Sequence, residues 1–98
     1  KHDIKEPVKI SENIDYIIHA AGIASPKFYR EFKIETIDVA TLGTKNMLEL
    51  AKEKNVKSIL FFSSSEVYGD PDPKYIPTPE TYNGNVSCIG PRANYYES

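Results

Sequence analysis

The stretch that decides the fold runs from Ser58 to Gly69 and reads SILFFSSSEVYG. Its first half, Ile59 to Phe62, is a short apolar run with the β-branched and aromatic content of a buried strand. The run passes directly into three serines and Glu66. In an open parallel α/β sheet, ligands bind at the carboxyl ends of the strands. The stretch predicts a strand that ends in ligand-facing polar side chains, although a plain serine-rich turn has the same composition.

A second buried strand is predicted from Tyr16 to His19, and it runs into Ala20, Ala21 and Gly22. Such small residues leave a backbone open to the close approach of a ligand. An ordinary strand exit has the same sequence, so both interpretations stay open on this segment alone.

From about Ile34 to Lys54 the apolar residues recur with the period of a helix. Gly43 weakens such a helix by roughly 1 kcal/mol relative to alanine, which is tolerated where a helix packs closely on a sheet. Asn55 predicts a left-handed end. One face is predicted to carry the apolar and small residues, which are Ile37, Ala40, Thr44, Met47, Leu48 and Ala51.

The order strand, helix, strand predicts one right-handed βαβ unit with parallel strands. Both strands look buried on two faces, so helices are expected on each side of the sheet. A single βαβ unit with two open edges is not a stable fold. We expect an α/β fold: a partial Rossmann-type, doubly wound parallel sheet, continued after Gly69 by a long proline-rich active-site loop.

Composition and charge exclude several classes of function. The chain has 98 residues and a net charge of −2 at pH 7, which gives no reason to expect nucleic acid or an anionic membrane surface as a partner. No apolar run is long enough to span a membrane, and no signal peptide is recognisable. The lone Cys88 cannot form an internal disulfide, and two distant histidines predict no metal site. We expect a reduced, cytoplasmic protein.

Three motifs resemble the extended short-chain dehydrogenase/reductase family, whose members include NAD-dependent nucleotide-sugar epimerases, dehydratases and decarboxylases. The motifs are His19-Ala20-Ala21-Gly22, Gly43-Thr44-Lys45-Asn46-Met47-Leu48 and Ser63-Ser64-Ser65-Glu66-Val67-Tyr68-Gly69. The likeness is greatest to the branch that decarboxylates UDP-glucuronate, because of His2-Asp3-Ile4, Ala24-Ser25-Pro26 and the segment from Gly84 to Tyr95. The resemblance implies NAD as the cofactor and a nucleotide sugar as the substrate.

The resemblance also implies which residues contact the cofactor. Asp3 and Ile4 match the pair that holds the adenine ring in this family. The other implied cofactor contacts are Ala20, Ala21, Gly22, Val39, Phe62, Ser63 and Tyr95.

Three residues match the family's catalytic positions. Tyr95 corresponds to the tyrosine of the Tyr-x-x-x-Lys motif, the base for the hydroxyl that is oxidised at the sugar C4. A free phenol titrates near 10, so this role needs a nearby cation at neutral pH. Ser64 matches the serine or threonine that hydrogen-bonds the reacting oxygen, and Glu66 matches the carboxylate that serves the chemistry at C5. The implied substrate-binding residues are Ser65, Glu66, Asn85 and Arg92.

Two parts of the family's machinery are absent from the sequence. The glycine motif that cradles the cofactor phosphates would precede Lys1, and the motif lysine would follow Ser98. We expect residues 1–98 to be the central part of an NAD-binding domain, inactive alone, from a homodimeric parent enzyme.

The sequence leaves the substrate open. The Ser65-Glu66 pair favours a decarboxylase, since the dehydratases typically have an aspartate at the first of these positions. Ala40 replaces an asparagine typical of the family, and Asp38 and Val39 replace its usual polar or basic pair. A 4,6-dehydratase or 4-epimerase acting on a dTDP- or UDP-hexose is therefore the first alternative.

An alternative of another class is a non-catalytic NAD(P)-binding sensor or scaffold. The joint presence of Ser64, Glu66 and Tyr95 favours an enzyme.

Overall fold

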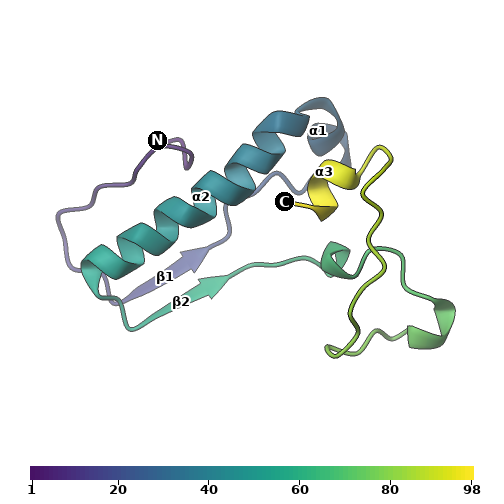
Figure 1. The fold of residues 1–98 in the computed structure, drawn as a ribbon. Helices are drawn as coiled ribbons and strands as arrows, with labels where there is room; N and C mark the ends of the chain where they lie inside the picture. Colours follow the sequence, from purple (N-terminus) through teal and green to yellow (C-terminus); the bar gives the residue numbers. More distant parts are fainter.

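A computed structural model describes residues 1–98 (Figure 1). Two parallel strands lie beside one long helix, and after the second strand the chain runs away from them as a long loop before a short last helix returns to the long one. The helices and strands are β1 (Tyr16–His19), α1 (Pro26–Glu31), α2 (Lys33–Lys54), β2 (Ser58–Phe61) and α3 (Ala93–Tyr96). Two short 3-10 turns, η1 (Ser65–Tyr68) and η2 (Pro73–Tyr75), lie within the loop region.

The strand–helix–strand prediction is confirmed. β1 and β2 pair in parallel, with Ile17 opposite Ile59 and His19 opposite Phe61, and α2 is the connection between them. The second strand begins one residue before the predicted Ile59. Phe62 lies beyond its end but still donates its N–H to the carbonyl of His19 over 3.0 Å.

Helix α2 begins and ends close to its predicted bounds. Asn55 terminates it in the left-handed conformation, at φ 49° and ψ 48°, as its sequence position predicts. Gly43 is buried in the middle of the helix, where a Cβ atom would meet Ile4 Cγ2 at 3.0 Å. The missing side chain therefore lets the amino-terminal segment lie directly against the helix at Ile4.

The core lies between α2 and the inner face of the two-stranded sheet. Its buried members are Ile17, Met47 and Leu50, each 9% exposed or less. Six partly buried residues surround them, namely Ile4, Val8, Ile14, Ala51, Val56 and Ile59.

Two predictions of burial are wrong for this chain. Ile18 and Leu60 are 68% and 56% exposed, because α2 covers one face of the sheet and no element of residues 1–98 covers the other. On α2, Ile37 and Leu48 belong to the predicted apolar face but are exposed. Met47 of that face is buried as predicted, and the helix also buries Thr36, Gly43 and Leu50, which lie outside the predicted face.

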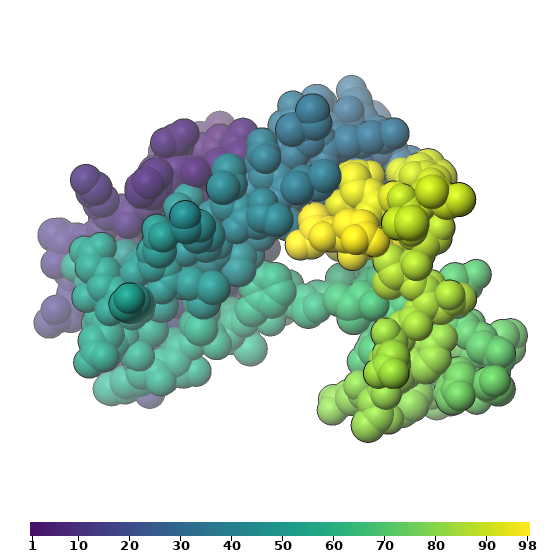
Figure 2. Space-filling view, viewed as in Figure 1, coloured from purple at the N-terminus to yellow at the C-terminus, as the bar shows by residue number.

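The segment after β2 is the predicted loop, and a single bridge closes it. Gly69 pairs with Asn85, the N–H of Asn85 donates to Tyr68 O over 2.8 Å, and the N–H of Asp70 donates to Asn85 O over 3.1 Å. Figure 2 shows the residues between these points projecting from the body of the molecule, which measures 48 × 30 × 17 Å. The bridge brings the chain back toward α1 and α2, where α3 lies.

Candidate active site

A cavity of about 390 Å³ lies where the chain leaves the carboxyl ends of β1 and β2. It is called the main cavity below because it contains the three predicted catalytic residues. The β1 exit, the β2 exit with η1, α2 and α3 each contribute to its wall. The lining includes Ala20, Ala21, Gly22, Phe62, Ser63, Ser64, Glu66 and Tyr95. The structure thus brings together eight of the site residues that the sequence predicts, from segments far apart in the chain.

The β1 exit presents little more than backbone to this cavity. Ala20, Ala21 and Gly22 are all exposed. A Cβ atom added to Gly22 would have no heavy atom within 4 Å, so open space lies in front of it. On the inner side, His19 Nε2 lies 3.2 Å from Thr44 Oγ1, which links the end of β1 to α2 at the edge of the cavity. The lining is open enough for a flat ring to approach the backbone closely.

Ser64 caps the 3-10 turn η1 that carries Glu66. Its backbone is extended, at φ −141° and ψ 151°, and its Oγ accepts a hydrogen bond from the Glu66 N–H over 3.3 Å. A side-chain cap of this kind fixes the direction in which a turn starts. Because a hydroxyl oxygen keeps its own proton to donate, Ser64 can cap the turn and still donate into the cavity.

Glu66 forms an ion pair with Arg92, between Oε2 and a terminal guanidinium nitrogen. The two side chains are 26% and 36% exposed. Glu66 Oε2 and Arg92 Nε are buried without a hydrogen-bond partner, so the ion pair is what compensates the buried carboxylate oxygen. The guanidinium also lies over the Tyr96 ring, 5.2 Å from its centroid. The pair therefore joins η1 to the start of α3.

The contacts that hold Tyr95 in place involve its ring, and its hydroxyl group takes no part in them. Its ring stacks on Tyr29 of α1, with centroids 4.5 Å apart. Next to it, Asn94 Nδ2 donates to the carbonyl oxygen of Tyr29 over 2.8 Å. Tyr29 and Asn94 were not predicted as site residues, because only their meeting in space gives them this role. The Ala93–Tyr96 helix, four residues long, is thereby located against α1.

A second cavity, of about 430 Å³, contains the predicted adenine-binding pair. Lys1, His2, Asp3, Ile4 and Ala21 line it. Ala21 belongs to both cavities, so the two adjoin at the β1 exit.

The backbone of the adenine-binding segment is fixed to α2. Asn46 Nδ2 donates to the Ile4 carbonyl oxygen over 2.9 Å, and Asp3 Oδ1 accepts from the Lys5 N–H over 3.0 Å. Asn46 stands in a motif that carries the family resemblance, but its link to Ile4 is not visible in the sequence.

Four predicted residues do not line the main cavity: Val39, Ser65, Asn85 and Arg92. Val39 is half-buried on α2 and Ser65 is exposed. Asn85 uses its side-chain amide to bond Asp70 O over 2.9 Å, so in this structure it closes the loop. The ligand contacts of these four residues stay predictions.

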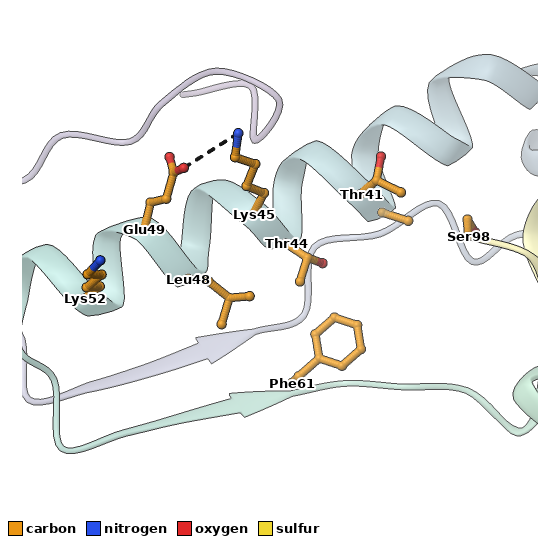
Figure 3. Close-up of a pocket in the computed structure, with 9 residues that line it drawn as sticks. Thr41, Thr44, Lys45, Leu48, Glu49, Lys52, Phe61 and Ser98 are labelled. Carbon is orange, nitrogen blue, oxygen red and sulfur yellow. Dashed lines mark ion pairs between the residues drawn. The ribbon is translucent and has the colours of Figure 1, made fainter.

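A third cavity, of about 520 Å³, lies between α2 and the end of β2 (Figure 3). Phe61 of β2 faces Leu48 and Thr44 across it, while Lys45 and Glu49 pair on the helix surface at 3.7 Å. It shares Ala40, Thr44, Phe61 and Ser98 with the main cavity but none of the predicted catalytic residues.

The structure contains no cluster of three or more His, Cys, Asp or Glu side chains arranged to hold a metal. None of its helices is both long and apolar enough to cross a membrane.

The pKa of the Glu12 carboxyl lies below its ordinary value, because the carboxylate accepts hydrogen bonds from the Glu12 N–H and from Ser11. Glu12 lines none of the three cavities.

A parallel βαβ unit with a cavity at the carboxyl ends of its strands is the arrangement of a Rossmann-type α/β protein. Residues 1–98 match the NAD dependent epimerase/dehydratase family over their whole length. The chain belongs to that family, and the family's cofactor is the one that the sequence predicts.

Similar proteins extend this result. The chain is 47% identical over 97 residues to UDP-glucuronic acid decarboxylase 5 of Arabidopsis thaliana, covering 99% of this chain and 27% of that protein. It is 47% identical over 96 residues to UDP-glucuronic acid decarboxylase 1 of Xenopus tropicalis, covering 98% and 22%. RMD from Pseudomonas aeruginosa complexed with NADPH has a similar structure, with a TM-score of 0.76 and 26% identity over 95% of this chain and 33% of that one. The chain thus spans about a quarter of the curated relatives it matches.

Proposed function

We propose that residues 1–98 form the central part of an NAD-binding domain in an enzyme that oxidises and decarboxylates UDP-glucuronate. The observation that carries this proposal is that Ser64, Glu66 and Tyr95 line one cavity beside the open backbone at Gly22. The 47% identity to UDP-glucuronic acid decarboxylases supports the choice of substrate.

The two adjoining cavities suit an extended dinucleotide. Asp3 and Ile4 would hold the adenine end, and Ala21, which lines both cavities, marks the junction between them. Phe62 and Ser63 would lie beside the nicotinamide, because they follow β2 at the edge where ligands of parallel sheets bind. Bound NAD⁺ would supply the hydride acceptor, chemistry that no protein side chain can provide.

Tyr95 is the proposed base for the sugar C4 hydroxyl. It takes the hydroxyl proton while C4 becomes a ketone, and Ser64 donates a hydrogen bond to the same oxygen. A phenol needs a cation nearby to do this at neutral pH. The position that follows Ser98 is where the family has a lysine, so a lysine there in the parent protein supports the enzyme over a sensor or scaffold.

Glu66 is the proposed proton carrier at C5. A ketone at C4 makes the C5 carboxylate a β-keto acid, which loses CO₂ and leaves its bonding electron pair in an enolate. Carbon C5 must then receive a proton, and Glu66 is the only ionisable carboxyl group in the cavity lining. A carboxyl group can return the proton when it lies within hydrogen-bond reach of that carbon.

The parent enzyme is further proposed to be a cytoplasmic homodimer. Leu48 and Ile34 of α2 are 53% and 72% exposed, and the cavity of Figure 3 lies on the same side as Leu48. A second copy that covered this side would bury that apolar surface. Sedimentation of the complete protein tests the proposed dimer, with Leu48→Glu expected to yield monomers.

The proposed cytoplasmic location is supported by Cys88, which is unpaired and exposed and therefore suits a reducing compartment.

Incubation of the complete protein with UDP-glucuronate and NAD⁺ tests the activity directly. We expect release of CO₂ and formation of UDP-xylose or its 4-keto precursor. Consumption of a UDP- or dTDP-hexose with UDP-glucuronate untouched would favour the dehydratase or epimerase alternative. NAD binding without turnover of any of these sugars would favour the sensor or scaffold.

A further inference from the structure

Glu66 is the only charged residue in the lining of the main cavity. That is a difficulty for the proposed substrate, because UDP-glucuronate brings a second carboxylate to the same site. Two unpaired carboxylates at close range repel each other strongly in a partly desolvated cavity. An enzyme for this substrate therefore needs a positive charge close to Glu66.

Arg92 provides that charge from outside the cavity. It pairs with Glu66 Oε2 but does not line the cavity itself. Its guanidinium is held in place by the Tyr96 ring, 5.2 Å away, and it immediately precedes α3, the helix of Tyr95. A planar guanidinium can bind a carboxylate and stack on an aromatic ring at the same time.

We propose that Arg92 is a positioning and specificity-determining residue that neutralises Glu66 and so allows the cavity to accept a sugar carrying its own carboxylate. This inference rests on the proposed function. Arg92 acts through Glu66 and need not touch the sugar. Its loss should weaken binding of UDP-glucuronate much more than binding of UDP-glucose, which has the same nucleotide and no carboxylate.

Binding is measured in the complete protein with Tyr95→Phe, so that neither sugar is consumed. Calorimetry at pH 8 with NAD⁺ present gives the dissociation constants of UDP-glucuronate and UDP-glucose. At that pH an unpaired carboxylate stays ionised. Adding Arg92→Gln should raise the constant for UDP-glucuronate about tenfold or more, and that for UDP-glucose less than about threefold. Arg92→Lys should restore part of the loss.

Two further variants separate this role from a structural one. Arg30→Gln removes the same charge from an exposed position on α1 and should change neither constant. Combining Glu66→Gln with Arg92→Gln removes both charges and should recover most of the affinity for UDP-glucuronate. A residue that merely supports the fold would not be rescued by a second deletion.

The outcomes that overturn the inference are distinct. Equal weakening of both sugars by Arg92→Gln, no weakening of either, or no recovery in the double variant would each remove Arg92 from this role while leaving the proposed function in place. If the protein with Tyr95→Phe alone binds neither sugar, the proposed function fails and this inference fails with it.

Discussion

The ring of Tyr95 lies on the ring of Tyr29, with the two planes inclined by only 17°. Tyr29 is 2% exposed, so the proposed base rests on one of the most deeply buried side chains of the chain. Offset stacking between aromatic rings contributes about 1 kcal/mol beyond the area it buries. The orientation of Tyr95 therefore depends on α1, a helix that supplies no reacting group.

Replacing Tyr29 tests this dependence. Tyr29→Ala should destabilise the complete protein by about 3 kcal/mol or more, as truncation of a buried aromatic residue does, and should lower turnover in the fraction that folds. Tyr29→Phe keeps the ring and is the matched control. It should retain most of the stability and most of the turnover. Thermal unfolding and turnover per folded protein measure the two effects. Equal turnover in the two variants would separate Tyr29 from the orientation of Tyr95.

The proton transfer assigned to Tyr95 predicts a clear separation of binding from turnover. Tyr95→Phe should reduce turnover by roughly 10²–10⁴-fold, while the dissociation constant of NAD⁺ changes little because most proposed cofactor contacts lie elsewhere. The ring and its stacking on Tyr29 are preserved in this variant. Retention of more than about a tenth of the rate would exclude Tyr95 as the base.

The link between Asn46 and Ile4 predicts an effect on cofactor affinity from a residue outside both cofactor cavities. Asn46→Ala removes the hydrogen bond to Ile4 O without harming helix propensity. A lost hydrogen bond of about 1 kcal/mol should raise the NAD⁺ dissociation constant about fivefold. Asn13→Ala, at an exposed position, is the control. Calorimetry on the complete protein decides, and unchanged affinity would show that the segment needs no such anchor.

The bridge between Gly69 and Asn85 predicts that any side chain at Gly69 strongly destabilises the loop. Gly69 has φ 67° and ψ −124°, and a Cβ there would meet Asn85 O at 2.2 Å. Gly69→Ala should cost about 1–3 kcal/mol or more and increase hydrogen exchange from residues 70 to 85. Gly22→Ala has open space around it and should leave stability nearly unchanged. Similar melting temperatures for the two variants would contradict the bridge.

The 98-residue chain should not bind NAD measurably by itself. No glycine-rich turn between a strand and a helix occurs within it, and such a turn provides most contacts to the cofactor pyrophosphate. Calorimetry with millimolar NAD⁺ on a folded sample is the measurement. A saturable heat of binding would show that the two cavities suffice.

Local patterns predicted the βαβ unit because each element has a strong signal of its own. The apolar runs beginning at Tyr16 and Ile59 have the length of buried strands, and Asn55 is a typical left-handed helix end. Helix α1 is only six residues long and carries no such signal. A period of 3.6 residues cannot be recognised over so few positions.

The buried face of α2 was predictable only in part because a distant segment helps to determine it. Ile4 lies directly against Gly43, so the side of the helix with small residues is buried, while Ile37 and Leu48 stay exposed. Site residues that belong to a sequence motif, such as Ser64 and Glu66, were predictable. Contacts between residues of two distant segments were not. The contacts made by Tyr29 and Arg92 join residues far apart in the chain, and no sequence pattern pairs them.

The bridge between Gly69 and Asn85 separates the length of the loop from the geometry of the cavity. Its two hydrogen bonds hold the ends of residues 70–84 together, so the excursion can change without moving Glu66 on one side or Arg92 on the other. Each doubling of a flexible loop adds only about 0.6 kcal/mol of closure entropy. Insertions between Pro71 and Tyr82 should therefore be tolerated. This makes the excursion a natural grafting point, where a reporter peptide could be attached to the protein a short distance from the proposed catalytic residues.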